Sequence, residues 1–356
     1  MSGKPKIFGH LLAEVVRKDL CVGCGACVSV CPVNAIDLEG DKPKLVGQCI
    51  ACGMCYANCP RAEFDEGEVE ERVFGRTRSE EEAELGVHTK LYAVRAKDEG
   101  VLARSQNGGA VTALLKQFLA EGGDGVVVTG LEEEGIWVPK PVVASNDEEI
   151  LEGSGTKYTP SPTLKGVGSA VKEFGKKRIA VVGTPCQMRA LRKVESGRFI
   201  NKEIKDAIDL RIGLFCMETF SYDSLMEYLR NEGVDPAEVD KFEVKNGRFI
   251  ANKDGGAIFK VKLPKVKELV RPCCHSCGDF ASEFADISVG NVGSPDGWST
   301  VVVRTERGAE ALRGAERAGG IEIEPVKEGK GGLGLVTRLA KLKKKGAAVA
   351  SEPSEK

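Results

Sequence analysis

A cysteine pattern that occurs twice near the start of the chain restricts the fold more than any other feature. Each copy carries three cysteines with two residues between them, then a fourth cysteine directly before proline. The copies are Cys21-Val-Gly-Cys24-Gly-Ala-Cys27-Val-Ser-Val-Cys31-Pro32 and Cys49-Ile-Ala-Cys52-Gly-Met-Cys55-Tyr-Ala-Asn-Cys59-Pro60. Repetition of one short unit predicts two similar halves that fold against each other.

This spacing is typical of bacterial ferredoxins with two 4Fe-4S clusters. Three thiolates of one half bind one cluster, and the cysteine before proline ligates the cluster of the other half. The rule assigns Cys21, Cys24, Cys27 and Cys59 to one cluster, and Cys49, Cys52, Cys55 and Cys31 to the second. A pair of zinc sites, the alternative, usually takes two cysteine pairs and leaves the third thiolate without a role. We therefore predict an α+β, ferredoxin-like two-cluster module over residues 1–62 that conducts single electrons.

Composition excludes several classes of protein. The chain has 356 residues and thirteen cysteines, and no apolar signal segment opens it, so thiolate ligands are expected rather than a disulfide framework. No stretch approaches the roughly 18 apolar residues of a spanning helix, so no integral membrane segment is expected. With 51 basic and 53 acidic residues the formal charge is -2, which argues against a nucleic-acid surface. We expect a cytoplasmic protein, with peripheral attachment to a membrane complex left open.

The rest of the chain divides by composition. Residues 63–87 are rich in Glu, Arg and Asp and predict an acidic linker. Residues 88–335 alternate strand and helix patterns, which predicts an α/β domain with a mixed or parallel sheet. The composition of residues 336–356 predicts a basic, flexible tail, in which a frayed helix is expected. The expected strands are 91–96, 125–129, 178–182, 210–215, 258–261, 286–289 and 300–304, and the expected helices include 110–120 and 223–231.

Five more cysteines lie in the α/β region, at Cys186, Cys216, Cys273, Cys274 and Cys277. The first two follow predicted strands, and α/β sheets bind ligands at the carboxyl ends of their strands. Four of the five suffice for a third cluster. Buried free cysteines, or a Cys-x2-Cys loop that is redox-active or binds zinc, are the alternatives. His275 is a further possible ligand, less favoured than a cysteine.

Two polar segments are candidates for binding an anion. Arg104-Ser105-Gln106-Asn107-Gly108-Gly109 precedes the helix at Ala110, and its glycines would let backbone amides approach a pyrophosphate. The plainer interpretation is a turn and a helix cap. In the second segment, residues 153–162, Lys157 is the candidate for a phosphate or an anionic ring edge.

Taken in order, the segments SQNGGAVTALL, GTKYTPSP, VVGTPCQ, CCHSCGDF and ADISVGNVG resemble the family of β subunits of coenzyme F420-reducing hydrogenase and related F420 dehydrogenases, over residues 88–310. The fused ferredoxin makes the chain similar to the electron-input component of F420H2 dehydrogenases. The resemblance implies a third 4Fe-4S cluster at Cys186, Cys216, Cys274 and Cys277, with Cys273 as the spare. It also implies FAD held at Ser105, Gln106, Asn107, Gly108, Gly109, Ala110, Thr156, Lys157, Tyr158, Gly183 and Thr184. Asn107 departs from the family pattern, in which a serine is expected.

The family implies an oxidoreductase that passes electrons between coenzyme F420 and one-electron carriers, through FAD and three clusters. The implied partner is a ferredoxin or a larger redox complex of the respiratory, hydrogenase, formate dehydrogenase or heterodisulfide reductase type. One alternative is the β subunit of an F420-linked formate dehydrogenase or hydrogenase. Another is a flavin-free protein that only conducts electrons.

Overall fold

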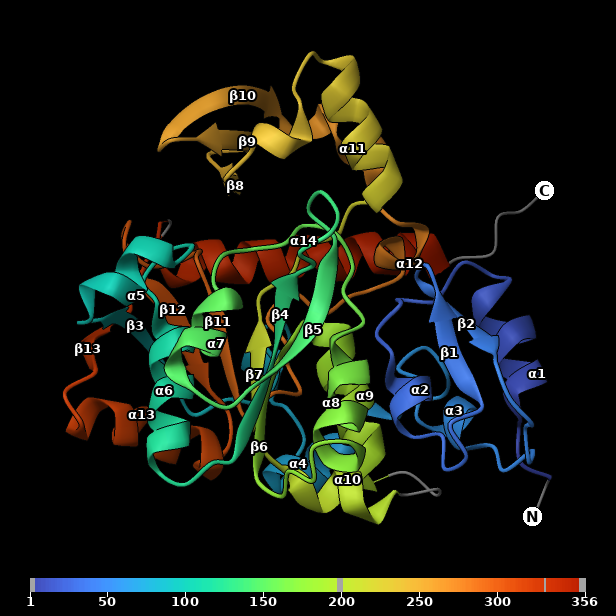
Figure 1. The fold of residues 1–356 in the computed structure, drawn as a ribbon. Helices are drawn as coiled ribbons and strands as arrows, with labels where there is room; N and C mark the ends of the chain where they lie inside the picture. Colours follow the sequence, from blue (N-terminus) through green and yellow to red (C-terminus); the bar gives the residue numbers. More distant parts are fainter. Residues whose placement is uncertain (1–3, 197–200, 330, 352–356) are drawn as a thin grey trace.

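The computed structural model describes residues 4–196, 201–329 and 331–351, and an eight-stranded sheet lies at its centre (Figure 1). The strand order is β13-β3-β12-β11-β7-β6-β4-β5. Neighbours among β11, β7, β6 and β4 are parallel, and antiparallel pairs flank them on both sides. The expected mixed or parallel sheet is therefore a mixed one. In that order the strands span Ile321–Pro325, Lys90–Ala96, Ser299–Val303, Ile287–Gly290, Ile208–Leu214, Ile179–Gly183, Gly125–Leu131 and Pro139–Ala144.

Helices cover both faces of this sheet because its central strands are apolar on both sides. Val126 and Val128 of β4 pack with helices α6 and α13, whereas Val127 faces helices α8 and α9. This alternation follows from the two-residue period of a strand. The helices of the first face are α5 (Glu99–Arg104), α6 (Ala110–Ala120), α7 (Asp147–Glu152) and α13 (Glu306–Arg317). Those of the second face are α8 (Thr163–Lys172), α9 (Pro185–Ser196) and α10 (Lys202–Ala207).

A separate lobe stands above the carboxyl edge of the sheet (Figure 1). It has its own three-stranded sheet, in the order β10-β9-β8, and a core that contains Phe220, Phe242 and Phe249. The predicted strand 258–261 was wrongly counted with the main sheet, since it belongs to β10. Alternating polarity identifies a strand but not the sheet that it joins. The lobe consists of α11 (Tyr222–Asn231), η3 (Pro236–Glu238), β8 (Lys241–Lys245), β9 (Arg248–Lys253), β10 (Gly256–Lys262), η4 (Leu263–Lys265) and η5 (Lys267–Leu269).

The N-terminal part has the predicted internal symmetry. Gly25 and Gly53, which correspond in the two repeats, have φ of 81° and 82° and begin the short helices α2 and α3. Gly23 and Ala51 also correspond and also have positive φ, 68° and 55°. The same sequence spacing thus produces the same loop twice. The elements here are α1 (Phe8–Leu11), η1 (Leu12–Val16), α2 (Ala26–Ser29), β1 (Ile36–Glu39), β2 (Lys42–Leu45) and α3 (Met54–Ala57).

Residues 63–87, expected as a linker, form part of the packed structure. They contain α4 (Glu66–Phe74) and η2 (Glu80–Glu82), and Val69 of α4 is buried in the same cluster as α8 and α9. Arg78 pairs with the buried Glu283 at 2.5 Å. The charged composition of this segment predicted exposure to solvent. Its acidic side chains instead form ion pairs with arginines, and this pairing permits the segment to be buried.

The expectation of a frayed tail was wrong for the part that the structure describes. Helix α14 (Leu333–Ser351) lies along the body of the molecule, and its residues Val336, Ala340 and Lys343 are buried (Figure 1). Those positions are spaced i, i+4 and i+7, so they share one helical face. Residues 352–356 of the predicted tail lie outside the described residues. No helix in the described ranges is long and apolar enough to cross a membrane.

Candidate metal centres and cofactor site

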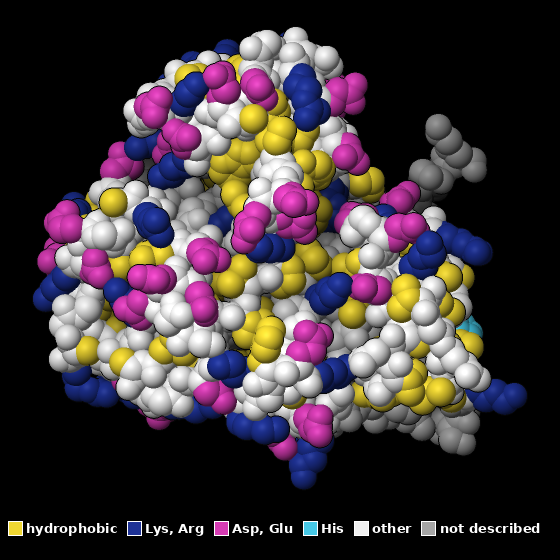
Figure 2. Space-filling model, in the orientation of Figure 1, with side chains coloured by type: hydrophobic (Ala, Val, Ile, Leu, Met, Phe, Trp, Pro, Cys, Tyr) yellow, Lys and Arg dark blue, Asp and Glu magenta, His cyan; other side chains and the backbone are white. Residues whose placement is uncertain are grey.

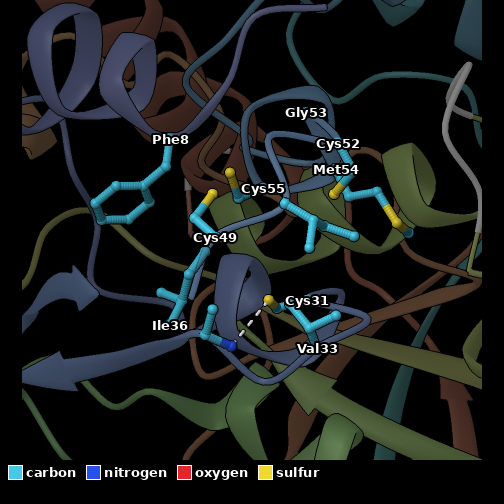
Figure 3. Close-up of a pocket in the computed structure, with 11 residues that line it drawn as sticks. Phe8, Cys31, Val33, Ile36, Cys49, Cys52, Gly53, Met54 and Cys55 are labelled. Atoms are coloured by element: carbon cyan, nitrogen blue, oxygen red, sulfur yellow. Dashed lines mark hydrogen bonds between the residues drawn. The ribbon is translucent and has the colours of Figure 1, made fainter. Parts of the chain in front are cut away.

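The four cysteines assigned to the second ferredoxin cluster line one pocket (Figure 3). Cys49 and Cys52 come from one loop and Cys55 from the helix that follows, while Cys31 comes from the other repeat. The Ala35 amide donates to the Cys31 sulfur at 3.2 Å and the Ala51 amide to the Cys49 sulfur at 3.4 Å. Amide donors stabilise a thiolate. The complete lining is Phe8, Cys31, Val33, Ala35, Ile36, Cys49, Ile50, Cys52, Gly53, Met54 and Cys55.

The other four N-terminal cysteines also gather as predicted. Burial raises the pKa of the Cys27 thiol well above its usual range, and the neighbouring Cys59, Cys21 and Cys55 raise it further. Burial likewise raises the pKa of the Cys24 thiol, with contributions from Cys27 and Cys59. Such thiols ionise in a shared buried site only beside a strong positive charge, and iron supplies that charge. The residues present therefore fit a metal cluster.

A third group forms at the carboxyl edge of the sheet from three separate segments. Cys186 lies in the first turn of α9 after β6, Cys216 follows β7, and Cys274 and Cys277 belong to the loop that begins with α12 (Pro272–His275). Burial raises the pKa of the Cys216 thiol; Lys343 opposes this, and Cys274, Cys186 and Cys277 add to it. The structure thus brings the four predicted ligands together.

The loop also positions the residues considered as rival ligands. Cys273 is buried, and its free thiol is hydrogen-bonded to the free thiol of Cys274, so it lies beside the group. The exposed His275 is part of the same short helix. Within the described ranges, no three or more His, Cys, Asp or Glu side chains are arranged to hold one metal ion. That finding concerns single ions, whereas a cubane presents four separate iron atoms and needs ligand sulfurs that are farther apart.

The three cysteine groups form a continuous series. Cys186 of the third group contributes to the raised pKa of the Cys24 thiol, and Cys55 contributes to that of Cys27. Backbone contacts hold the groups in place, because the Leu164 amide of α8 donates to the Cys24 carbonyl oxygen at 2.9 Å. At Gly25 a β-carbon would lie 2.7 Å from the Lys165 nitrogen, so only glycine permits this approach.

The three segments predicted to hold FAD meet at the carboxyl edge. The Gln106 side chain accepts from the Thr156 amide at 3.1 Å and donates to the Phe242 carbonyl of the lobe at 3.3 Å. The Thr184 amide donates to the Gln187 side chain at 2.9 Å, and that side chain donates to the Ser161 carbonyl at 3.0 Å. Gln106 therefore joins the first two predicted segments directly, and Gln187 joins the third to Ser161, which follows the second segment closely. The sequence separates these segments by up to about eighty residues.

Several predicted FAD residues already serve the fold. A β-carbon at Gly108 would lie 2.5 Å from the Ser299 nitrogen, so this glycine lets the loop pack on β12. Gly109 has φ of +71° and caps α6. Asn107 accepts from the Gly297 amide at 2.9 Å, and the Tyr158 hydroxyl accepts from the Val244 amide at 3.0 Å. The plainer interpretation, a turn and a cap, accounts for both glycines.

Ser105, Ala110 and Lys157 complete the predicted set. The Ser105 hydroxyl donates to the Val101 carbonyl at 2.6 Å, and Ala110 is buried. The Lys157 ammonium donates to the carbonyls of Gly153 and Ser154 at 3.1 and 2.7 Å. Burial lowers the pKa of Lys157 to about 8. The Gly155 carbonyl accepts a third bond at 3.5 Å, so in this conformation Lys157 offers an anion its charge but no free N–H group.

Sequence reasoning missed the cations that contact the cysteine groups. Lys193 donates to the Cys59 carbonyl at 2.9 Å, Lys343 to the Cys274 carbonyl at 3.4 Å, and Arg271 to the Cys21 carbonyl at 3.3 Å. Only for Lys343 did the sequence hold a signal, since it continues the buried face of α14 through Val336 and Ala340.

An α/β domain with cysteines at its carboxyl edge, docked to a ferredoxin-like N-terminus, defines a class of iron-sulfur proteins. The sequence model described as coenzyme F420 hydrogenase/dehydrogenase, beta subunit, matches with its N-terminal part at residues 91–167 and its C-terminal part at 176–329. A 4Fe-4S binding domain matches residues 14–37. The chain belongs to the family of coenzyme F420 hydrogenase/dehydrogenase beta subunits, as its motifs predicted.

Relatives agree with this assignment. The beta subunit of coenzyme F420 hydrogenase from Methanosarcina barkeri is 38% identical over 74% of this chain and 91% of its own length. A subunit of the F420H2 dehydrogenase from Methanosarcina mazei is 33% identical over 95% of this chain and 93% of its own length. Among solved structures, a chain of the F420-reducing [NiFe] hydrogenase complex from Methanosarcina barkeri shares 39% identity and a TM-score of 0.71, over 75% of this chain and 92% of that one.

Proposed function

We propose that this chain is an oxidoreductase that passes electrons between coenzyme F420 and one-electron carriers, using FAD and three 4Fe-4S clusters. The family to which the chain belongs and the names of its relatives support coenzyme F420 as its redox partner. The dehydrogenase type is favoured because the F420H2 dehydrogenase relative is similar over 95% of the chain, ferredoxin part included, whereas the hydrogenase relative covers 74%.

The observation that carries this proposal is the continuous series of cysteine groups. It begins beside the proposed FAD segments, since Cys186 closely follows Gly183 and Thr184. It continues from Cys186 to Cys24 and from Cys27 to Cys55. Electrons that leave the carboxyl edge of the sheet would thus meet the group at Cys186 first, then the group that contains Cys24, and then the group that contains Cys49.

The chain's own residues have definite roles in this scheme. FAD, when bound, can exchange a hydride on one side and single electrons on the other, which a chain with both kinds of partner requires. Lys157 would hold a phosphate of the cofactor by charge. Gln106 holds its loop against Thr156 and the lobe, so that the proposed site keeps its shape before the cofactor binds. Such preorganisation limits the entropy lost on binding.

The proposed exit for electrons is the group at the exposed end of the series. Cys49 is exposed there, and large hydrophobic side chains around it are exposed as well, with Val46 at 62% and Ile50 at 56%. Hydrophobic side chains are visible on the ferredoxin part of the surface in Figure 2. A protein partner, either a ferredoxin or a component of a redox complex, would cover such a patch.

The test is anaerobic turnover by the purified, cluster-loaded chain. We expect bound FAD, oxidation of F420H2 with a one-electron dye, and a yellow chromophore that remains after iron is removed. A colourless protein after iron removal would instead establish the flavin-free conducting protein. Co-purification with a formate- or hydrogen-oxidising subunit would assign the chain to those complexes rather than to a dehydrogenase.

A further inference from the structure

Two lysines are buried among the residues that the structure describes, Lys193 and Lys343, and each donates to the backbone carbonyl of a proposed cluster ligand. Lys193 of α9 donates to Cys59 at 2.9 Å and to the Glu63 carbonyl at 2.7 Å. Lys343 of α14 donates to the carbonyls of Met217 and Cys274, the latter at 3.4 Å. The two lysines come from distant parts of the sequence and reach different cysteine groups.

Neither lysine has the partner that a buried ammonium usually needs. Buried charges in proteins are normally paired, because carbonyl dipoles alone do not repay the loss of hydration. Within the described ranges, no ion pair joins Lys193 or Lys343 to a carboxylate. By contrast, the buried Arg192 pairs with Asp286 at 2.8 Å. The anion opposite each lysine must therefore come from elsewhere.

We propose that Lys193 and Lys343 are the countercharges of two different iron-sulfur clusters and raise the reduction potentials of those clusters. Lys193 acts on the cluster held by Cys21, Cys24, Cys27 and Cys59. Lys343 acts on the cluster held by Cys186, Cys216, Cys274 and Cys277. The inference rests on the proposed function, which assigns these ligands.

The physical reason is the charge that a cluster gains on reduction. An added electron makes a thiolate-bound cluster more negative, so a fixed positive charge nearby stabilises the reduced state and raises the potential. Burial strengthens the effect because water does not screen it. Because α9 and α14 supply the lysines, the α/β domain would set the potential of one ferredoxin cluster as well as its own.

Lys172 provides an internal comparison. It donates to the Cys31 carbonyl at 2.8 Å, so its bond resembles that of Lys193, but the residue is exposed and also bonds the Asn34 side chain. Water screens an exposed charge. Its influence on the second ferredoxin cluster should therefore be smaller, which separates an effect of buried charge from an effect of the hydrogen bond.

The experiment is a redox titration of the full-length, cluster-loaded chain, followed by electron paramagnetic resonance. Iron content is measured first for every variant, and the third cluster's signal is identified by its loss in Cys216→Ala. We expect Lys193→Met to make one-electron reduction of a ferredoxin cluster about tenfold less favourable, a fall of about 59 mV, and to leave the third cluster unchanged. Lys343→Met should shift only the third cluster. Lys172→Met should give a smaller shift.

The matched control is Lys341→Met, an exposed position two residues before Lys343 on the same helix, which should leave every midpoint unchanged. Lys193→Arg and Lys343→Arg keep the charge and should keep the wild-type potentials, even if the methionine variants lose iron. Full iron content with unmoved midpoints in both methionine variants would overturn the inference and leave the proposed function intact. Equal shifts in the arginine and methionine variants would also overturn it. A wild-type chain that binds no clusters would overturn both the inference and the proposed function.

Discussion

The guanidinium of Arg271 donates to the carbonyl oxygen of Val22 at 3.0 Å, which ties the loop before the paired cysteines to the first cysteine loop of the ferredoxin part. The same side chain bonds the Cys21 carbonyl at 3.3 Å and forms an ion pair with Asp41. These bonds span about 250 positions of sequence. They fix the proposed third cluster site relative to the first ferredoxin site.

Substitution of Arg271 tests that connection. We expect Arg271→Gln to destabilise the chain by about 2 kcal/mol, because it removes hydrogen bonds made by a buried charged group. Electrons should also pass more slowly from the α/β domain to the ferredoxin clusters. Urea denaturation and rapid-mixing spectroscopy would measure the two effects. Arg313→Gln, at an exposed helix position, is the control and should change neither.

Lys157 offers a cleaner test of the proposed FAD site than the glycines do. Gly109→Val is the natural choice from sequence, but a β-carbon there would lie 2.8 Å from the Val101 side chain, so the variant would damage the fold itself. Lys157→Met should instead weaken FAD binding at least about tenfold, because it removes the charge that we propose acts on the phosphate. It should also raise the melting temperature of the FAD-free protein, because a desolvated ammonium is removed.

Thermal melts with and without added FAD would show both effects. The exposed Lys97→Met is the control and should alter neither value. Unchanged FAD affinity in Lys157→Met would place the phosphate elsewhere.

Iron analysis separates the two adjacent cysteines of the third site. With three clusters the chain should bind about twelve iron atoms, and Cys216→Ala should leave about eight. Cys274→Ala should also lose about four iron atoms, whereas Cys273→Ala should keep about twelve. The reverse result for these last two variants would make Cys273 the ligand and Cys274 the spare.

A buried carboxylate predicts how the fold responds to acid. Asp286 receives a bond from Arg192 at 2.8 Å and an ion pair from Arg211 at 3.3 Å. Burial opposes ionisation of Asp286, but the two arginines outweigh it and hold the pKa at about 2. In the unfolded chain the pKa is about 3.9. The ionised group therefore stabilises the fold above about pH 4, by about 2 to 3 kcal/mol, and this contribution is lost as pH falls from about 4 to 2.

Urea denaturation at several pH values would check this expectation. Asp286→Asn should lower stability at neutral pH by about 2 to 3 kcal/mol, because two buried guanidinium groups lose one of their two carboxylate partners and keep only Glu195. Its stability should then fall less than that of the wild type between about pH 4 and 2. Parallel pH curves for the two proteins would contradict the assigned role of Asp286.

Much of the architecture was predictable from local sequence. The helix at Ala110–Ala120 has the predicted bounds, and the core strands agree with prediction to within about two residues, because hydrophobic period and glycine position act over a few residues. The grouping of the eight N-terminal cysteines was also predictable, since loop spacing restricts which thiolates can reach one cluster. The grouping of Cys186, Cys216, Cys274 and Cys277 followed only from the family resemblance, because these cysteines lie on separate segments of the chain. The family could also be identified from sequence, because each of its motifs lies in one continuous segment of the chain.

Only the tertiary structure decided what surrounds those segments. Contacts between distant parts of the chain pack the segment 63–87 and helix α14 onto the body and place β10 in a separate lobe. Such contacts also bring Lys193 to the carbonyl of Cys59 and Lys343 to the carbonyl of Cys274. The apolar face of α14 indicates that Lys343 is buried, but no local pattern shows which carbonyl group either lysine reaches. Burial removes the screening of each lysine's charge by water and so strengthens its electrostatic effect on nearby groups. This burial exists only once the chain has folded.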